Sequence, residues 1–222
     1  MKKNNLLITF GILFLFGITI APSVNGAITT VTSEADKDSY VTTSNPTTNY
    51  GGADWLIFGY YITDFAEAYL HFNFTDKPAN FTKAEITIDM YSISATVNLT
   101  ASIITDSWSE TGITWVNKPD HGQVISAFTA STEQVYSIDV TNFITGTGIS
   151  ICINATDFTQ TAYVQARSSE GGYSWSTLLP TPKLVWTYNA PDTQIPGFNI
   201  LILLGSMLGI TLFIIRKYKL KK

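Results

Sequence analysis

Apolar and polar residues alternate with a period of two along most of residues 27–190. In residues 67–74, for example, Ala68, Leu70, Phe72 and Phe74 alternate with more polar neighbours. The same alternation marks residues 84–91, 97–103 and 149–154, with shorter candidates at residues 55–60, 135–138, 163–167 and 183–188. A period of two is typical of strands with one buried face. The pattern therefore predicts one all-β domain over residues 27–190, an antiparallel β-sandwich of jelly-roll-like type.

Residues 108–119 do not follow this alternation. Trp108 and Trp115 lie seven positions apart, with a glycine between them and a proline at the end of the stretch. Residues 113–116 are therefore predicted to be a short strand between two turns. Each tryptophan ring carries about 200 Å² of mostly apolar surface, so each is expected either to be buried or to face a ligand. Elsewhere the sequence predicts only one short helical turn, at residues 140–145, with Asp139 as its N-cap.

Both ends of the chain have the composition of membrane-targeting segments. Residues 1–26 begin with two lysines and contain an apolar run at 6–20, which predicts a signal peptide cleaved before Ala27; an uncleaved anchor helix is the alternative. Residues 191–197 form a short linker, and residues 198–215 are uncharged and long enough to predict a transmembrane helix. The basic tail, 216–222, predicts that the tail is cytoplasmic and that the domain lies at the outer face of the membrane, in type I topology.

The composition restricts the possible partners. The chain is 45% hydrophobic, 13% aromatic and 14% charged, which fits a β-rich domain with membrane segments. Residues 27–190 contain six Lys and Arg against sixteen Asp and Glu, a net charge of −10, which argues against nucleic acid as a partner. Cys152 is the only cysteine, so no disulfide can form within the chain.

Four Asn-x-Thr sequons lie in the predicted domain, at Asn73, Asn80, Asn98 and Asn154. Three of them fall on the outward phase of their strands and Asn80 falls in a loop, as N-glycosylation outside the cell requires. We expect at least one of them to be glycosylated; chance occurrence in a threonine-rich chain is the alternative.

Most catalytic constellations are absent from the sequence. The two histidines, His71 and His121, lack zinc-like spacing, and Cys152 in its apolar strand is expected to be inert. Glu110 or Glu170 could pair with another acid for glycoside hydrolysis, but sequence does not show the separation that this chemistry needs. No catalytic residue is therefore assigned, and the chain is predicted not to be an enzyme.

Sugar binding is the chemistry that the aromatic residues favour, because sugar C–H faces stack on exposed rings. A platform of Tyr173 and Trp175, which lie in a Gly/Ser-rich loop, with Arg167 nearby, is the first candidate, and Trp108 is the second. Further aromatic candidates are Trp55, Tyr60, Tyr61 and Trp115, although Trp115 and Trp186 are expected in the core.

No cofactor is required by the sequence, although Ca²⁺ is possible. Glu34, Asp36 and Asp38 are close together near the first strand and are candidate ligands. The alternative is a solvated acidic edge that discourages strand pairing. The acidic balance favours a neutral glycan, since an anionic one would need a bridging cation.

Several motifs occur in an order that resembles a known family. The motifs are Asp38-Ser39-Tyr40-Val41, Asn49-Tyr50-Gly51, Ala68-Tyr69-Leu70-His71-Phe72, Trp108-Ser109-Glu110, Ile113 to Pro119, Asp139-Val140-Thr141, Ser168-Ser169-Glu170 and Pro182 to Tyr188. Together they resemble the disaggregatase-related DNRLRE domain, or carbohydrate-binding module family 96, over residues 34–189. The resemblance implies an extracellular β-sandwich and polysaccharide binding. The family's usual Ser-Arg-Glu is Ser168-Ser169-Glu170 here, with Arg167 adjacent.

At the C-terminus, Pro196, Gly197 and Phe198 precede the apolar span and resemble an archaeal PGF-type sorting signal. That resemblance implies replacement of the span by a lipid anchor, whereas a retained type I helix is the alternative. Asn199 stands where such signals usually have a small residue.

Taken together, the sequence predicts a surface-anchored, non-catalytic module for carbohydrate binding or cell-surface adhesion. Its expected partners are a polysaccharide or surface glycan and the membrane. A structural cell-envelope protein without a sugar ligand is the second hypothesis. A polysaccharide lyase or hydrolase is the third.

Overall fold

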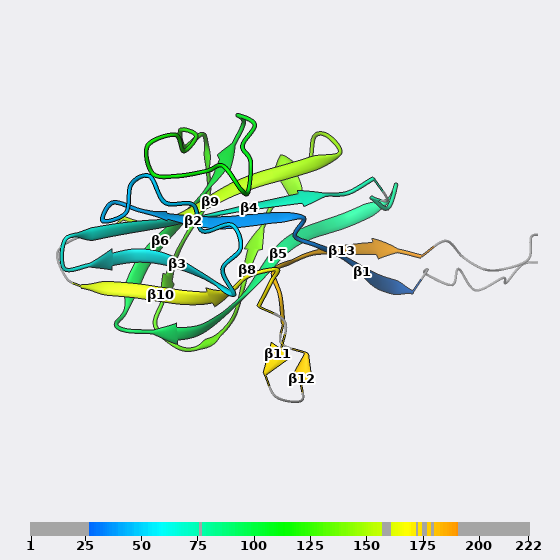
Figure 1. Ribbon diagram of the computed structural model, residues 1–222. Helices are drawn as coiled ribbons and strands as arrows, with labels where there is room; N and C mark the ends of the chain where they lie inside the picture. Colours follow the sequence, from blue (N-terminus) through cyan, green and yellow to red (C-terminus); the bar gives the residue numbers. More distant parts are fainter. Residues whose placement is uncertain are drawn as a thin grey trace, which may run out of the picture. The chain divides into compact units, whose positions relative to one another are not determined.

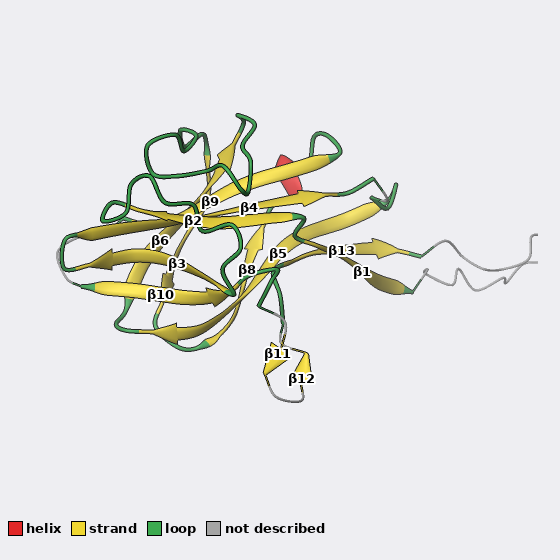
Figure 2. Cartoon of the chain, viewed as in Figure 1, coloured by secondary structure: helices red, strands yellow, loops and turns green. Residues whose placement is uncertain are grey.

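Thirteen β-strands and one 3-10 turn are present in the computed structural model, which describes residues 27–75, 77–156, 161–171, 173–174, 177–178 and 180–190 (Figures 1 and 2). The strands are β1 (Ile28–Glu34), β2 (Lys37–Thr42), β3 (Trp55–Tyr61), β4 (Asp64–Asn73), β5 (Phe81–Ile93), β6 (Val97–Ile104), β7 (Val124–Ala130), β8 (Gln134–Asp139), β9 (Gly148–Ala155), β10 (Ala162–Arg167), β11 (Tyr173–Ser174), β12 (Thr177–Leu178) and β13 (Lys183–Asn189). Within these residues, no helix has the length and apolar character needed to cross a bilayer. The predicted signal peptide, linker, sorting motif, transmembrane helix and tail lie outside the described residues.

Eleven strands form one antiparallel sheet in the order β1-β13-β5-β10-β3-β4-β9-β6-β7, with β2 paired to β4 and β8 paired to β5. The strand β5 has 13 residues. One of its edges pairs with β13 over the first part of its length and with β10 over the last part. Because β10 pairs on its other edge with β3, the sheet curls around its core without a break (Figure 1). The all-β antiparallel class is thus confirmed, while the predicted two-sheet sandwich is one continuous curled sheet. The short β11–β12 hairpin forms a separate two-stranded sheet.

The alternation seen in the sequence corresponds to the inner face of this curl. On β5, Ala84, Ile86, Ile88 and Met90 are all fully buried, and the residues between them are half-buried. Trp186 on β13 is also buried, with its ring 5.1 Å from the rings of both Phe74 and Phe81. The prediction that Trp186 belongs to the core is therefore confirmed.

A second, smaller hydrophobic cluster lies on the outer face of the sheet. Val41, Tyr69 and Cys152 project from β2, β4 and β9 on the phase that should face water, yet all three are fully buried. Ile104 and Ile113 complete this outer cluster, and Trp108 and Trp115 pack against it. Residues 105–123, which we call the Trp108 loop, cover this cluster. Strand alternation alone could not reveal this, because burial of the outer phase depends on a loop distant in sequence.

The predicted strand at residues 113–116 is wrong: the stretch forms hydrogen bonds within its own loop and to residues 46–49, but no strand ladder. The N–H groups of Gly112 and Ile113 both donate to the carbonyl of Ser109, at 3.1 and 2.8 Å. The Asn117 side chain accepts from the Thr114 N–H at 2.7 Å and donates to the Gly112 carbonyl at 2.9 Å. With these backbone groups satisfied locally, the segment needs no partner strand.

Contacts from residues 46–51 hold the Trp108 loop in place. The Asn49 side-chain amide donates to the carbonyls of Glu110 and Ile113, at 2.6 and 2.7 Å. Gly51 packs so closely against Glu110 that an added Cβ would lie 2.2 Å from its carbonyl oxygen. The loop is therefore fixed to the sheet at several points along its length.

The predicted helical turn is present in a shorter form, as the 3-10 turn Thr141–Phe143 (Figure 2). Val140 occupies the N-cap position, but the Asp139 carboxylate still accepts from the Thr141 N–H at 2.9 Å and from its hydroxyl at 2.6 Å. These hydrogen bonds lower the pKa of Asp139. Alternation does not predict the strands β1, β2 and β7. All residues of β1 are exposed or half-buried and five consecutive residues of β2 are buried, so neither of these two strands has one buried and one exposed face.

Candidate functional site

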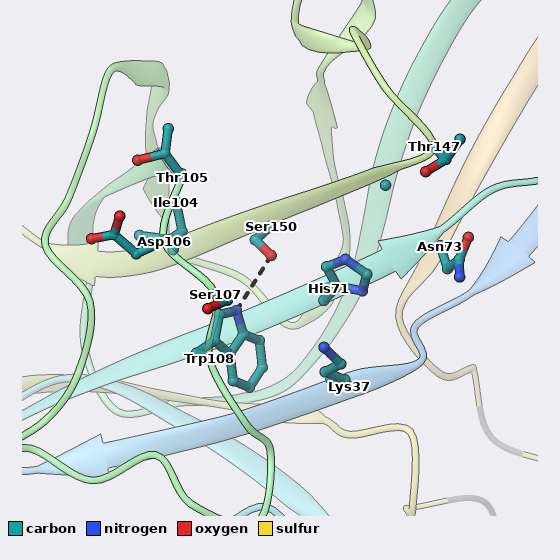
Figure 3. Close-up of a pocket in the computed structure, with 11 residues that line it drawn as sticks. Lys37, His71, Asn73, Ile104, Thr105, Asp106, Ser107, Trp108, Thr147 and Ser150 are labelled. Atoms are coloured by element: carbon teal, nitrogen blue, oxygen red, sulfur yellow. Dashed lines mark hydrogen bonds between the residues drawn. The ribbon is translucent and has the colours of Figure 1, made fainter.

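A groove of about 480 Å³ runs along the outer face of the sheet beside Trp108 (Figure 3). Its floor follows one row of the strand register, in which Lys37 on β2 pairs with His71 on β4, and His71 pairs with Ser150 on β9. Neighbours in register on one face of a sheet present their side chains together. We call this space the Trp108 groove; its wall residues are Lys37, His71, Asn73, Ile104, Thr105, Asp106, Ser107, Trp108, Thr147, Gly148 and Ser150.

Trp108 is half-buried and is held on both sides. Its indole N–H donates to the Ser150 hydroxyl at 3.3 Å, and its ring meets the Tyr69 ring edge-on at 6.0 Å. The Lys37 ammonium lies 6.0 Å from the ring centroid, at the outer limit of a cation–π contact. Figure 3 shows the indole between Lys37 and Ser150, with His71 and Asn73 farther along the groove.

A hydrogen bond to Asp36 fixes the position of the His71 side chain in the groove. The Asp36 carboxylate accepts a hydrogen bond from His71 Nδ1 at 2.6 Å and a second one from the Asn73 N–H at 3.0 Å. The other ring nitrogen, Nε2, lies against Gly148, where an added Cβ would be 3.0 Å away. Glycine at this position therefore leaves room for the imidazole at the groove wall.

A second groove, of about 490 Å³, adjoins the first on the far side of Trp108. Asp106, Ser107 and Trp108 line both grooves, and the second continues past Asn117 and Lys118. Both volumes lie within the roughly 300–1,000 Å³ of small-molecule sites. Trp108 is thus an aromatic surface with polar grooves on either side.

Of the expected platform of Tyr173, Trp175 and Arg167, only the Arg167 side chain is described, and it does not line this groove. Trp175 lies outside the described residues, and of Tyr173 only the backbone, in β11, is described. Arg167, on β10, places its guanidinium 3.9 Å from the centroid of the Tyr91 ring. Its Nε is 3.9 Å from Asp89 Oδ2, too far for a hydrogen bond, and has no hydrogen-bond partner. Arg167 therefore faces the outer surface of β5.

The other aromatic candidates occupy separate surroundings. Trp55 and Tyr61 are exposed at the two ends of β3, and Tyr61 meets Tyr163 edge-on at 5.4 Å beside a smaller groove of about 190 Å³. Tyr60 is half-buried against Phe65. Trp115 is half-buried in the outer cluster beneath the Lys118 ammonium, 4.6 Å away. Among these, the β3 surface around Trp55 and Tyr61 is the alternative place for a sugar.

The three acids expected to cluster have different partners. Glu34 pairs with Lys183 at 3.2 Å, and Asp36 binds His71, whereas Asp38 meets Glu110 and Glu170. These last three carboxylates have oxygens within 4.8 Å of one another. They are brought together because Ser168 anchors the turn after β10 to the Ala53 carbonyl, at 2.7 Å. An oxygen-rich cation site in this region would therefore involve Glu110 and Glu170 with Asp38.

Asp38 is almost fully buried, and this burial raises its pKa to about 7. The Ser169 N–H, 2.6 Å from Asp38 Oδ2, acts against this shift, while the negative charges of Glu170 and Glu110 add to it. No ion pair links these three acids to Lys or Arg within the described ranges. None of them lines either groove beside Trp108, so their proximity does not make a substrate cleft.

A cluster that sequence spacing did not reveal lies under the Trp108 loop. His121, Glu67 and Cys152 bring their ligand-capable atoms within 4.8 Å of one another. Burial raises the pKa of Glu67, but hydrogen bonds from His121 and Lys118 outweigh it and leave the pKa lowered. The three residues come from a loop and two strands, so no local motif records their proximity.

The sequons differ in their accessibility. Asn73, Asn80 and Asn98 are exposed, but Asn154 is half-buried and accepts a hydrogen bond from Thr100 at 2.8 Å. Asn73 also lines the Trp108 groove, so a glycan on its side chain would cover the groove.

Comparison with known proteins identifies one family. The family model described as carbohydrate-binding module family 96 matches residues 29–179, which is 151 of the 222 residues. No curated protein matches the chain.

Proposed function

The chain belongs to carbohydrate-binding module family 96, and from this membership we propose that it is a non-catalytic module that binds a glycan in the Trp108 groove. Domains of carbohydrate-binding families are typically non-catalytic, so membership suggests binding without turnover. The observation that supports this location is the Trp108 ring, which borders two polar grooves and is held by Ser150 and Tyr69. A fixed ring costs little conformational entropy when a sugar stacks on it.

Polar groups on the groove walls suit sugar hydroxyls. Ser150 and Asn73 offer donors and acceptors, and Asp106 can accept hydrogen bonds at the entrance shared with the second groove. Lys37 and Asp106 carry opposite charges, and the surrounding domain is strongly acidic. These features favour a neutral polysaccharide over an anionic one.

Substitution of Trp108 tests this location. We expect Trp108→Ala to weaken binding of the full chain to a neutral polysaccharide by about 10- to 100-fold, through loss of the stacking surface. Affinity electrophoresis over a panel of neutral and acidic polysaccharides, with Ca²⁺ and then with EDTA, provides the measurement. Trp55→Ala, on the β3 surface, is the matched control and should bind as the wild type does.

The opposite result, with Trp55→Ala impaired and Trp108→Ala unaffected, would place the glycan on β3. Retention of the folded chain on none of the polysaccharides would favour the structural cell-envelope hypothesis. Release of shorter sugars from any of them would favour a lyase or hydrolase.

We also infer an extracellular, membrane-anchored location, which rests on the sequences of the two termini. Exposure of three sequons supports it, since each is accessible for modification. If the groove is used for binding, glycans are expected on Asn80 and Asn98 and not on Asn73. Mass mapping of peptides from the native host checks this, and a chain without any glycan would contradict the expectation of N-glycosylation. The same peptide map shows whether the C-terminal span is retained or replaced by a lipid.

A further inference from the structure

The ligand-capable atoms of Glu67, His121 and Cys152 lie within 4.8 Å of one another, and the two distances from His121 match those of a metal site. His121 Nε2 lies 3.1 Å from Glu67 Oε2 and 3.5 Å from Cys152 Sγ. In a tetrahedral zinc site, with bonds of about 2.0–2.1 Å to N and O and about 2.3 Å to S, these separations are roughly 3.3 and 3.5 Å. The observed distances differ from this geometry by only a few tenths of an ångström.

We propose that Glu67, His121 and Cys152 bind a Zn²⁺ ion, with a water molecule as the fourth ligand. Thiolate, imidazole and carboxylate are the three side-chain types that Zn²⁺ takes in proteins. Binding displaces the proton of the Cys152 thiol to solvent, so that the thiolate and the Glu67 carboxylate together balance the two positive charges of the ion.

The ligands are held in place without the ion. Glu67 and Cys152 lie on the adjacent strands β4 and β9; Cys152 pairs with Tyr69, two residues along β4 from Glu67, so the two ligands are diagonal neighbours on the outer face. His121 is positioned by its neighbour Gly122, whose N–H donates to the Ile103 carbonyl at 2.9 Å and whose Cα has no room for a side chain. The Tyr69 hydroxyl donates to Glu67 Oε2 at 3.0 Å, which orients the carboxylate. Such outer hydrogen bonds commonly orient metal ligands.

Access is possible from one side. The side chain of His121 is 29% exposed, whereas Cys152 is fully buried. An ion therefore reaches the thiol past the imidazole.

Lys118 competes with the ion for the carboxylate. Its ammonium lies 2.8 Å from Glu67 Oε2 and, in the same position, 4.6 Å from the Trp115 ring centroid. Removing this charge by Lys118→Met is expected to raise zinc affinity several-fold.

Co²⁺ substitution provides the test, because a thiolate bound to Co²⁺ gives a near-ultraviolet charge-transfer band. The full chain, with its thiol reduced and the reductant removed under anaerobic conditions, is titrated with Co²⁺ and then with Zn²⁺. We expect one Co²⁺ per chain, the charge-transfer band, the visible bands of tetrahedral Co²⁺, and displacement by one equivalent of Zn²⁺. Cys152→Ser should remove the charge-transfer band, and His121→Ala should weaken zinc binding by about 100-fold or more.

The other histidine supplies the control. His71→Ala removes an imidazole on the same sheet but leaves the three ligands intact, so it should bind zinc as the wild type does. Thermal unfolding verifies that each variant is folded, and His121→Ala changes an exposed loop residue if Cys152→Ser does not fold. Absence of the charge-transfer band in the folded wild type, or equal zinc binding by wild type and His121→Ala, would overturn the proposal.

Discussion

The wild-type chain is expected to lose stability as the pH rises from 5 to 8, and Asp38→Asn should remove most of that loss. Asp38 is 1% exposed and has a pKa of about 7, raised chiefly by burial, against an ordinary value of 3.8. In the folded chain it is therefore neutral at pH 5 and charged at pH 8, while in the unfolded chain it is charged at both. The groups facing it are the carboxylates of Glu110 and Glu170 and the backbone N–H of Ser169.

The direction of this change in the free energy of unfolding follows from the number of protons bound in each state. Between pH 3.8 and 7 the folded chain binds more protons at Asp38 than the unfolded chain does, so the free energy of unfolding falls as the pH rises. The slope approaches about 1.4 kcal/mol per pH unit, and the whole loss is about 4 kcal/mol, complete above pH 7. Roughly 2–3 kcal/mol of it falls between pH 5 and 8. The lowered pKa values of Glu67 and Asp139 act in the acid range below this window.

Urea unfolding of the full chain, followed by tryptophan fluorescence at pH 5 and pH 8 in EDTA, measures the effect. The introduced amide resembles the protonated carboxyl of Asp38 but does not ionise in the unfolded chain. At pH 5 the variant should therefore be the more stable by about 1–2 kcal/mol, because part of the wild-type loss has already occurred above pH 3.8. At pH 8 the variant should be the more stable by about 4 kcal/mol, so that the gap widens by about 2–3 kcal/mol between the two pH values. Glu133→Gln, in an exposed turn, is the control and should keep the wild-type pH dependence. Equal slopes for wild type and Asp38→Asn would contradict the buried-acid explanation.

The same experiment in Ca²⁺ tests a calcium site that differs from the predicted set of Glu34, Asp36 and Asp38, because in the structure Asp38 lies near Glu110 and Glu170 instead. If Ca²⁺ binds among Asp38, Glu110 and Glu170, the stability that the wild type loses at pH 8 should be restored by Ca²⁺ and lost again in EDTA. Asp38→Asn should respond much less. If Ca²⁺ leaves the stability of the wild type at pH 8 unchanged, then protonation, and not Ca²⁺ binding, relieves the repulsion among these three carboxylates.

The inner core could be predicted from sequence because its signal is local. On β5 and β13 each second residue is buried, and the period of two is visible in the chain itself. The outer cluster could not be predicted in this way, because Tyr69 and Cys152 are buried by the Trp108 loop, which is distant from both in sequence. Curling into one sheet was also not visible, because it depends on β10 pairing with both β3 and β5.

The candidate site could be predicted only in part, because sequence patterns identify single residues and not their tertiary neighbours. Trp108 was identified because a large ring in a punctuated segment must be buried or bind something. Lys37, His71 and Ser150 are brought together by strand register, and Trp108 reaches them only through tertiary contacts such as its hydrogen bond to Ser150. The sequence predicts Cys152 to be inert because it lies in an apolar strand, and His121 lacks zinc-like spacing in the sequence. Their 3.5 Å separation arises from tertiary structure alone.

Gly51→Ala is expected to displace the Trp108 loop and destabilise the chain by about 2–3 kcal/mol, a typical cost of overpacking. The added Cβ would lie 2.2 Å from the Glu110 carbonyl oxygen and 2.7 Å from its carbonyl carbon, so the loop backbone itself must move. That movement also disturbs the hydrogen bond from Asn49 to the same oxygen and the bond from the Asp38 N–H to the Glu110 side chain. Because Trp108 is two residues from Glu110, glycan binding should weaken along with stability.

Gly52 provides a control that differs by one position. A Cβ at Gly52 meets no atom within 4 Å, so Gly52→Ala should change stability by less than about 0.5 kcal/mol and leave glycan affinity unchanged. Urea unfolding and affinity electrophoresis of the two variants give the comparison. If Gly51→Ala lowers both stability and affinity while Gly52→Ala lowers neither, the position of the Trp108 loop governs binding. If both variants behave as the wild type does, the loop is not held by its close packing against Gly51, and a rigid Trp108 cannot be the basis of the site.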